Sequence, residues 1–154
     1  MKIVNEHKID LVKIAEGLNI TLDSLKDFLD DGRVLGRLGE FIEKERLKIE
    51  REPENSIFDL NDKGEKIEIR SITKQVSFAQ SKEIGYGRKV TEEGFTNKLN
   101  NLDCFILIDK RNLSELKFIK VTKKDIYYLI DNNHLNKNKS ISSKKFYEIF
   151  ERGL

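Results

Sequence analysis

Apolar side chains recur every three or four residues within the first 50 positions, the spacing that lines one face of an α-helix. They fall into three groups: Leu11, Ile14, Ala15 and Leu18; Leu22, Leu25, Phe28 and Leu29; and Val34, Leu35, Leu38, Phe41 and Ile42. The third group continues into the charged segment EKERLKIERE, which is typical of a helix that extends into solvent. Residues 1–50 are therefore predicted to form two short helices and one long helix. Glu40 falls inside the apolar half of the long helix, and we interpret it as a rim residue rather than an acid that faces a site.

The period of the pattern changes after residue 55. SIFDL and EKIEIRSI flank NDKG, which predicts two strands joined by a turn in which Gly64 adopts a positive backbone angle. LDCFILID and LSELKFIKV are two further β-rich runs. The first of them is continuously apolar, which predicts a central strand buried on both faces.

Capping residues predict two more helices near the end of the chain. Thr122 and Asp125 can cap the start of KKDIYYLID, and Ser143 can start KKFYEIFER, with Gly153 beyond its end. The order of helices, then strands, then helices favours an α+β fold with helices packed on a sheet. A chain of 154 residues has the usual size of one domain.

Composition narrows the class of protein. The chain has 36% charged residues and no apolar run near the roughly 20 residues of a membrane helix, and MKIVNEHKID lacks the apolar stretch of a signal peptide. We therefore expect a soluble, cytoplasmic protein that does not bind a membrane. The single cysteine, Cys104, lies in the apolar run CFILI and is predicted to be a buried, reduced thiol without a chemical role.

The net charge of +2 hides an asymmetry between two parts of the chain. Residues 1–65 carry 11 basic and 16 acidic side chains, whereas residues 66–154 carry 18 basic and 11 acidic ones. Lysine and arginine release condensed counterions when they neutralise a nucleic-acid backbone. The basic part indicates a phosphate-facing surface, although an ordinary solvated, lysine-rich surface would have the same composition.

The predicted hairpin carries the candidate chemistry. Glu68 and Arg70 are two residues apart on one strand, so their side chains leave the same face while Ile67 and Ile69 point into the core. Antiparallel pairing can bring Asp59 beside Glu68. Two adjacent carboxylates repel unless a cation lies between them, and hard oxygen ligands suit Mg²⁺. We therefore predict that Asp59, Glu68 and the Ile69 carbonyl bind Mg²⁺, although a surface ladder of Glu and Arg would show the same spacing.

The arrangement resembles the PD-(D/E)xK nuclease core, and the flanking residues resemble PvuII-type restriction endonucleases. FLDDGRVLGRLGEFIEKERL is similar to the long helix ahead of the family's site, and FDLNDKGEKIEIRSI is similar to its catalytic hairpin. CFILID and LSELKFIKVTKKDIYYLID resemble its paired strands and the following helix, in the same order. The resemblance covers about Phe28 to Tyr147, so the first 27 residues are poorly covered.

This resemblance implies a restriction-endonuclease-like mixed β-sheet flanked by helices, in a single nuclease domain over residues 1–154. Residues 1–50 would form the dimerisation region, and residues 51–154 would carry catalysis and DNA binding. The resemblance implies a homodimer that hydrolyses both strands of double-stranded DNA at a short, palindromic site with Mg²⁺ as cofactor. A cognate DNA methyltransferase would be a separate protein of the same system.

Arg70 departs from the family pattern, because it stands where the family has its catalytic lysine. Asp59 and Glu68 match the metal-ligand positions, so the catalytic set becomes Asp59, Glu68 and Arg70. A guanidinium keeps the charge but is planar and bulky, and it would tend to grip Glu68 or the phosphate. We therefore expect Arg70→Lys to cut faster. Lys66 and Lys74 are close in sequence, but we do not assign the lysine role to either of them.

A polar segment between the hairpin and CFILID contains amides, hydroxyls and cations that can read base edges or contact phosphates. In the resembling enzymes this region approaches DNA, and we predict DNA contacts from it and from one later histidine. The predicted residues are Lys74, Gln75, Ser77, Gln80, Ser81, Lys82, Tyr86, Arg88, Lys89, Asn97 and His134. An ordinary polar loop followed by a short helix would have the same composition.

Three other functions fit the same residues. A structure-specific nuclease, such as a junction resolvase, would cut branched but not linear DNA. A DNA-binding regulator would use the first two predicted helices without metal, as helix-turn-helix readers do. A catalytically impaired relative would keep the fold and bind DNA without cutting it.

Overall fold

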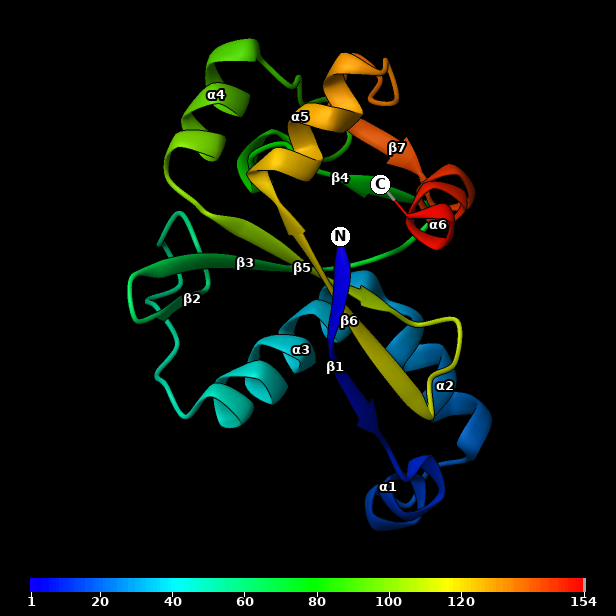
Figure 1. Ribbon diagram of the computed structural model, residues 1–154. Coiled ribbons are helices and arrows are strands. Elements are labelled where there is room, and N and C mark those ends of the chain that lie inside the picture. The colour runs from blue at the N-terminus through cyan, green and yellow to red at the C-terminus, as the bar shows by residue number, and fades with distance from the viewer. Residues whose placement is uncertain (154) are drawn as a thin grey trace.

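A mixed five-stranded sheet forms the centre of the molecule in the computed structural model, which describes residues 1–153 (Figure 1). The strands lie in the order β1 (Lys2–Lys8), β6 (Glu115–Thr122), β5 (Cys104–Asp109), β3 (Glu65–Ser71) and β2 (Leu60–Asp62). Only β3 and β5 are parallel, and all other neighbours are antiparallel. A second, two-stranded sheet pairs β4 (Gln75–Ser77) with β7 (Ser140–Ser142).

Helices cover both faces of the five-stranded sheet, so the predicted α+β class is confirmed. Three precede β2: α1 (Leu11–Leu18), α2 (Leu22–Asp30) and α3 (Gly32–Leu47). Three follow it, α4 (Glu92–Asn100), α5 (Lys123–Asp131) and α6 (Ser143–Arg152), together with the short 3-10 helix η1 (Ser81–Glu83). Within residues 1–153, no helix is both long enough and apolar enough to span a membrane.

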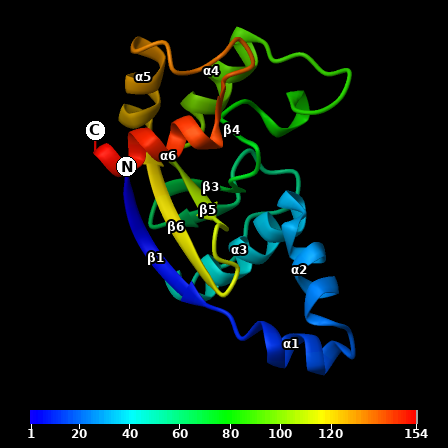
Figure 2. The same ribbon diagram turned by 90° about the vertical axis from the view of Figure 1, so that its right-hand side faces the viewer.

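Each face of the sheet has its own hydrophobic core. On one face, α3 packs against Ile67 and Ile69 of β3 and against Ile106 and Ile108 of β5. On the other face, α4, α5, α6 and the small sheet cover Phe105 and other side chains of β5 and β6. Figures 1 and 2 show α3 on one side of the sheet and α4 and α5 on the other. β3 therefore has α3 on one face and α4 beside the other.

The central position predicted for the CFILID strand is confirmed. All six residues of β5 are buried, and the strand lies between β3 and β6. Parallel neighbours need a long crossover, which residues 72–103 provide between β3 and β5. That crossover contains α4, so the same segment that makes β3 and β5 parallel also places α4 against the sheet.

Helix caps follow the sequence closely. Thr122 and Asp125 form a reciprocal capping box at the start of α5, as predicted. The last helix starts at Ser143, as predicted, with Ser142 as its N-cap, and Gly153, with φ of 77°, follows its last residue, Arg152. The turn between β2 and β3 places Lys63 and Gly64 at positive φ, and Asn61 accepts from the Gly64 backbone.

Three strands were not predicted from the sequence. β1 pairs with β6 at the edge of the sheet, with a register shift between Ile3 and Asn5, and most of its side chains stay at least partly exposed. An edge strand of this kind lacks a strongly apolar pattern because backbone pairing, rather than burial, fixes it. The other two, β4 and β7, have three residues each. The predicted SIFDL strand is present only in part, because β2 begins at its last residue, Leu60, and runs to Asp62.

Candidate functional site

β3 positions Glu68 and Arg70 on the face of the sheet that α4 covers. Ile67 and Ile69 are 2% and 5% exposed and belong to the opposite core, as the period of two predicts. Glu68 is 6% exposed, and the Arg70 guanidinium lies 5.1 Å from the centre of the Phe105 ring. The two polar side chains are thus held between the sheet and the elements that follow it.

Asp59 approaches β3 from the segment before β2. Its backbone N–H donates to the Ile67 carbonyl at 2.9 Å, and its carboxylate Oδ2 accepts from the Ile69 N–H at 2.7 Å. Leu60 pairs with Ile67, so Asp59 is the next residue along and lies opposite Glu68. Asp59 is therefore fixed to β3 through its backbone and its side chain.

A cavity of about 600 Å³ brings these groups together. It is formed by α3, Asp59, β3 and the segment that leads into η1. Its lining residues are Asp31, Gly32, Arg33, Gly36, Arg37, Glu40, Asp59, Glu68, Ile69, Arg70, Ser71, Thr73, Ser81 and Ile84. Four carboxylates, Asp59 and Glu68 among them, and three arginines thus border one space although they lie far apart in the sequence.

The pKa of Asp59 is raised to about 7. Burial is the largest cause, and the negative charge of Glu68 is the second; the Ile69 N–H lowers the pKa, and Glu40 raises it further. The ionised form of Asp59 is disfavoured because the carboxylate is buried and lies close to other negative charges. A cation bound beside Asp59 would offset both effects.

Glu68, in contrast, contacts two cationic side chains. Its Oε1 accepts from Arg70 Nη2 at 3.0 Å and from the Ser81 hydroxyl at 3.3 Å, and its Oε2 lies 2.7 Å from Lys98 Nζ. Lys98 is 3% exposed, and burial lowers its pKa although the nearby Glu68 charge opposes that change. The predicted ion pair between Arg70 and Glu68 is present. The ion pair between Lys98 and Glu68 was not predicted.

Lys98 reaches Glu68 from α4, 30 positions later in the chain. No local spacing connects the two residues, because only the packing of α4 on the sheet brings them together. The one available signal is on the helix itself: Lys98 shares the apolar face of Phe95 and Leu99, both 4% exposed. A lysine inside an apolar helix face indicates a buried partner for its charge.

Glu40 also lines the cavity, rather than lying only at a rim. Its Oε2 is 2.6 Å from Arg51 Nη2 and 3.6 Å from Arg37 Nη1. Its charge contributes to the raised pKa of Asp59. The interpretation of Glu40 as a rim residue is therefore wrong, since Glu40 lines the same cavity as Asp59 and Glu68 and its charge acts on Asp59.

The donor groups of the cavity suit a magnesium ion, which binds through one or two carboxylates and keeps several waters. Asp59 and Glu68 supply the carboxylates, and Ile69 lines the same cavity. Within residues 1–153 there is no group of three or more His, Cys, Asp and Glu side chains arranged to hold a metal ion. A metal here would therefore depend on two acids, a backbone carbonyl and water.

The residues predicted to contact DNA divide into three sets. Ser81 lines the cavity, and the Ser77 carbonyl accepts from Arg70 at 2.7 Å. Four others have contacts within the protein or are buried. Gln75 accepts a hydrogen bond from Ser140, Gln80 is buried, and Arg88 donates to backbone carbonyls. His134 is half-buried beside Tyr128 and is not among the residues that line the cavity. The side chains of Lys74, Lys82, Tyr86, Lys89 and Asn97 are exposed.

Cys104 is a buried free thiol, as predicted, and burial raises its pKa to about 12. The thiol stays protonated near neutral pH, which removes its nucleophilic form. Cys104 faces the core on the α3 side of the sheet. It takes no part in the cavity that contains Asp59.

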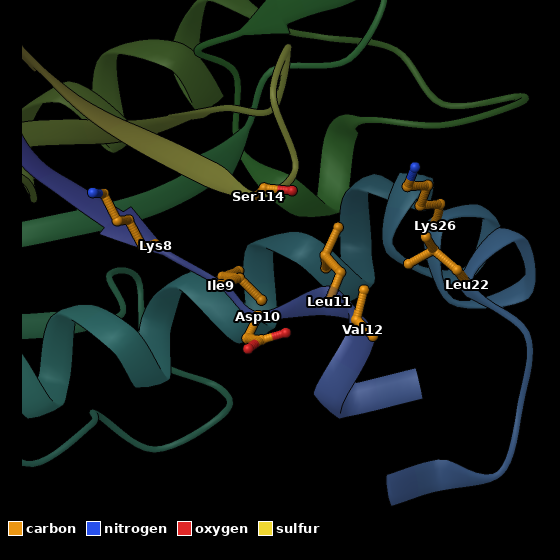
Figure 3. Close-up of a pocket in the computed structure, with 8 residues that line it drawn as sticks. All are labelled: Lys8, Ile9, Asp10, Leu11, Val12, Leu22, Lys26 and Ser114. Carbon is orange, nitrogen blue, oxygen red and sulfur yellow. The ribbon is translucent and has the colours of Figure 1, made fainter. Parts of the chain in front are cut away.

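A second cavity, of about 530 Å³, lies where β1 runs into α1 (Figure 3). Figure 3 shows the chain from Lys8 to Val12 on one side of it, and Leu22 and Lys26 of α2 on another. Its lining includes a single carboxylate, Asp10, whose Oδ1 caps α1 by accepting from the Lys13 N–H. The paired acids of the first cavity make that cavity the stronger candidate for chemistry.

Comparisons with protein-family models, with curated proteins and with solved structures find no match to this chain.

Proposed function

We propose that this protein is a Mg²⁺-dependent deoxyribonuclease that cuts double-stranded DNA at a short specific site. The observation that carries the proposal is the pair formed by Asp59 and Glu68 in the wall of one cavity. The raised pKa of Asp59 supports it, because burial and like charge leave that carboxylate in need of a cation. The restriction-endonuclease-like class of the fold is part of the same proposal.

Asp59, Glu68 and the Ile69 carbonyl would hold the metal. A bound Mg²⁺ polarises a scissile phosphate and lowers the pKa of a coordinated water, which is the chemistry of phosphodiester hydrolysis. Arg37 and Arg70 line the same cavity and carry positive charge for the phosphate group. The Ile69 N–H keeps Asp59 in place, and the Ser81 hydroxyl and Arg70 hold Glu68.

The exposed part of the predicted DNA-binding set supports a nucleic-acid surface beside the cavity. Lys82 lies in η1, and Tyr86 and Lys89 lie in the exposed loop that follows it. Tyr86 extends fully into solvent between Gly85 and Gly87, both at positive φ. Ser81, the first residue of η1, borders the cavity itself. Cations and an aromatic ring on one exposed loop can contact phosphates and stack on bases.

The proposed enzyme is a homodimer, because a two-fold symmetric site is read most simply by a two-fold symmetric protein. Large apolar side chains of the first two helices are exposed, with Leu18 at 60% and Phe28 at 58%. An exposed apolar surface of this kind suits a contact between two copies of the chain. As in other restriction systems, a separate DNA methyltransferase would protect the host DNA.

The test is the loss of cleavage without loss of DNA binding. Asp59→Asn and Glu68→Gln remove one ligand charge each, so both variants should lose Mg²⁺-dependent cleavage while retaining binding to the DNA that the parent protein cuts. Cleavage is followed by mapping the ends of a DNA of known sequence, and binding by a gel shift in Ca²⁺. If either variant cut at the parental rate, the site assignment would be wrong; cutting of branched DNA alone would favour a structure-specific nuclease.

A further inference from the structure

We propose that Lys98 is a positioning residue of this site, holding the Glu68 carboxylate and the segment that carries Asp59 in fixed relation to each other. The inference rests on the proposed function and extends it to a residue 30 positions beyond the hairpin. Its basis is one ammonium group that contacts both segments.

The first contact is with Glu68. Lys98 Nζ lies 2.7 Å from Glu68 Oε2, and both side chains are almost fully buried, at 4% and 7% exposure. Arg70 holds the other oxygen, Oε1, from the same strand. The Glu68 carboxylate is thus fixed at both oxygens, by a guanidinium of β3 on one side and an ammonium of α4 on the other.

The second contact is with the chain just before Asp59. Lys98 Nζ also donates to the backbone carbonyl of Ile57, which is two residues from Asp59 and outside any strand. That segment is also tied to β3 by the two hydrogen bonds of Asp59, from its N–H to the Ile67 carbonyl and from the Ile69 N–H to its Oδ2. Lys98 therefore links the irregular segment that leads to Asp59 directly to the side chain of Glu68.

Helix α4, which carries Lys98, is held in place by its N-terminal cap and by buried side chains. Thr91 caps the helix by accepting from the Gly94 N–H, and its own hydroxyl donates to Glu83 at 2.7 Å. A side chain at Gly94 would meet the Glu83 carboxylate at 2.3 Å, so glycine allows this close approach. Phe95 and Leu99 on either side of Lys98 are buried in the core. An ammonium held this way keeps its position without rearranging when charge develops nearby.

Two effects on the site follow from this arrangement. The positive charge of Lys98 competes with a divalent cation for Glu68, so it weakens cation binding. The same contacts fix the geometry of both acids and add positive charge near the phosphate, so they raise the rate of cleavage. Replacing a residue that only fills space in the core would not raise the cation affinity while lowering the cleavage rate.

The experiment measures both quantities in Lys98→Met, which keeps the length and apolar stem of the side chain but removes the charge. Calorimetric titration of Ca²⁺ into the DNA-free protein should show binding about tenfold tighter than in the parent, and single-turnover cleavage in saturating Mg²⁺ should be at least tenfold slower. Lys98→Gln, which retains a donor, should shift both quantities in the same directions and serves if the methionine variant fails to fold.

Lys66→Met is the matched control, because Lys66 lies on β3 with its ammonium 5.7 Å from the Phe58 ring and does not line the cavity. It should leave both quantities within twofold of the parent. Unchanged or weaker Ca²⁺ binding in the Lys98 variants, or an unchanged rate, would overturn the positioning role while leaving the nuclease intact. A parent protein that binds no Ca²⁺ and cuts no DNA would instead refute the proposed function, and the role of Lys98 with it.

Discussion

At the scale of single residues, Arg70 has more contacts than a replacement for lysine needs. One guanidinium donates to Glu68 Oε1, to the Ser77 carbonyl at 2.7 Å and to the Ser81 hydroxyl at 3.2 Å. Only a planar group with several fixed donors can span partners on β3, β4 and η1. Arg70 therefore joins these segments around Glu68, and Lys98 places an ammonium on the other carboxylate oxygen of Glu68.

This contact set reverses the expectation that Arg70→Lys would cut faster. A lysine has one nitrogen and cannot hold Glu68 and the Ser77 carbonyl together, so we expect Arg70→Lys to lower the free energy of unfolding by about 1–2 kcal/mol. The cleavage rate should not rise, because Lys98 already places an ammonium on Glu68. Urea unfolding and single-turnover kinetics measure the two effects. A lysine variant that cut tenfold faster would restore the original expectation and would count against the role of Lys98.

The sequence predicted the residues of the site that share one hairpin and missed those that come from elsewhere. Glu68, Arg70 and Asp59 follow from the period of two and from antiparallel pairing, which are local properties. Lys98 and Glu40 lie on helices that pack against opposite faces of the sheet. Lys98 contacts Glu68, and Glu40 lies close enough to raise the pKa of Asp59. Both placements depend on tertiary packing, which no spacing in the sequence encodes.

At the scale of elements, patterns with strong local causes were predicted and edge pairing was not. The apolar stripes of α1, α2 and α3 and the capping box of α5 are properties of short windows. β1 has the sequence KIVNEHK, whose burial is weak and irregular, and its place is fixed by pairing with β6. Such a strand becomes recognisable only when its partner is known.

The end of β5 is tied to α6 by a buried acid, which gives a pH-dependent prediction. Asp109 is 4% exposed; burial raises its pKa, but hydrogen bonds from Arg111 and Tyr147 outweigh burial and leave the pKa below its usual value. A lowered pKa in the folded state contributes stability above the ordinary carboxyl pKa, and this stability is lost as the pH falls through the folded value.

We therefore expect Asp109→Asn to lower the free energy of unfolding by about 2 kcal/mol at pH 7, since it weakens charge-assisted hydrogen bonds. The difference from the parent should shrink steadily below about pH 4, where the carboxyl group of the unfolded parent becomes protonated while that of the folded parent still resists protonation. Urea unfolding at a series of pH values measures both. A difference that stayed constant down to pH 3 would show that the charge of Asp109 does not hold β5 to α6. Cleavage should persist at pH 7, because Asp109 does not line the cavity.

At the scale of the whole molecule, the proposed dimer has to use a surface that leaves the cavity open. The cavity is bordered by α3, β3 and the segment leading into η1, whereas α1 lies at the far end of the molecule from α4 (Figures 1 and 2). Val12 and Leu18 of α1 and Phe28 of α2 are each more than half exposed. These exposed apolar side chains on the two helices offer a contact for a second copy at a distance from the cavity.

Charges placed on that surface should separate the dimer and leave each fold intact. Leu18→Glu combined with Phe28→Glu puts two like charges into the proposed contact, and since both side chains are largely exposed, the stability of the single chain should change little. We expect sedimentation to shift from twice 18.0 kDa to a single 18.0 kDa chain. Cleavage of both strands at one site should become single-strand nicking or stop, because one chain holds one pair of acids.

Tyr127→Glu is the control, since Tyr127 is 50% exposed on α5. A parent protein that sediments as a monomer both alone and on DNA would exclude this arrangement.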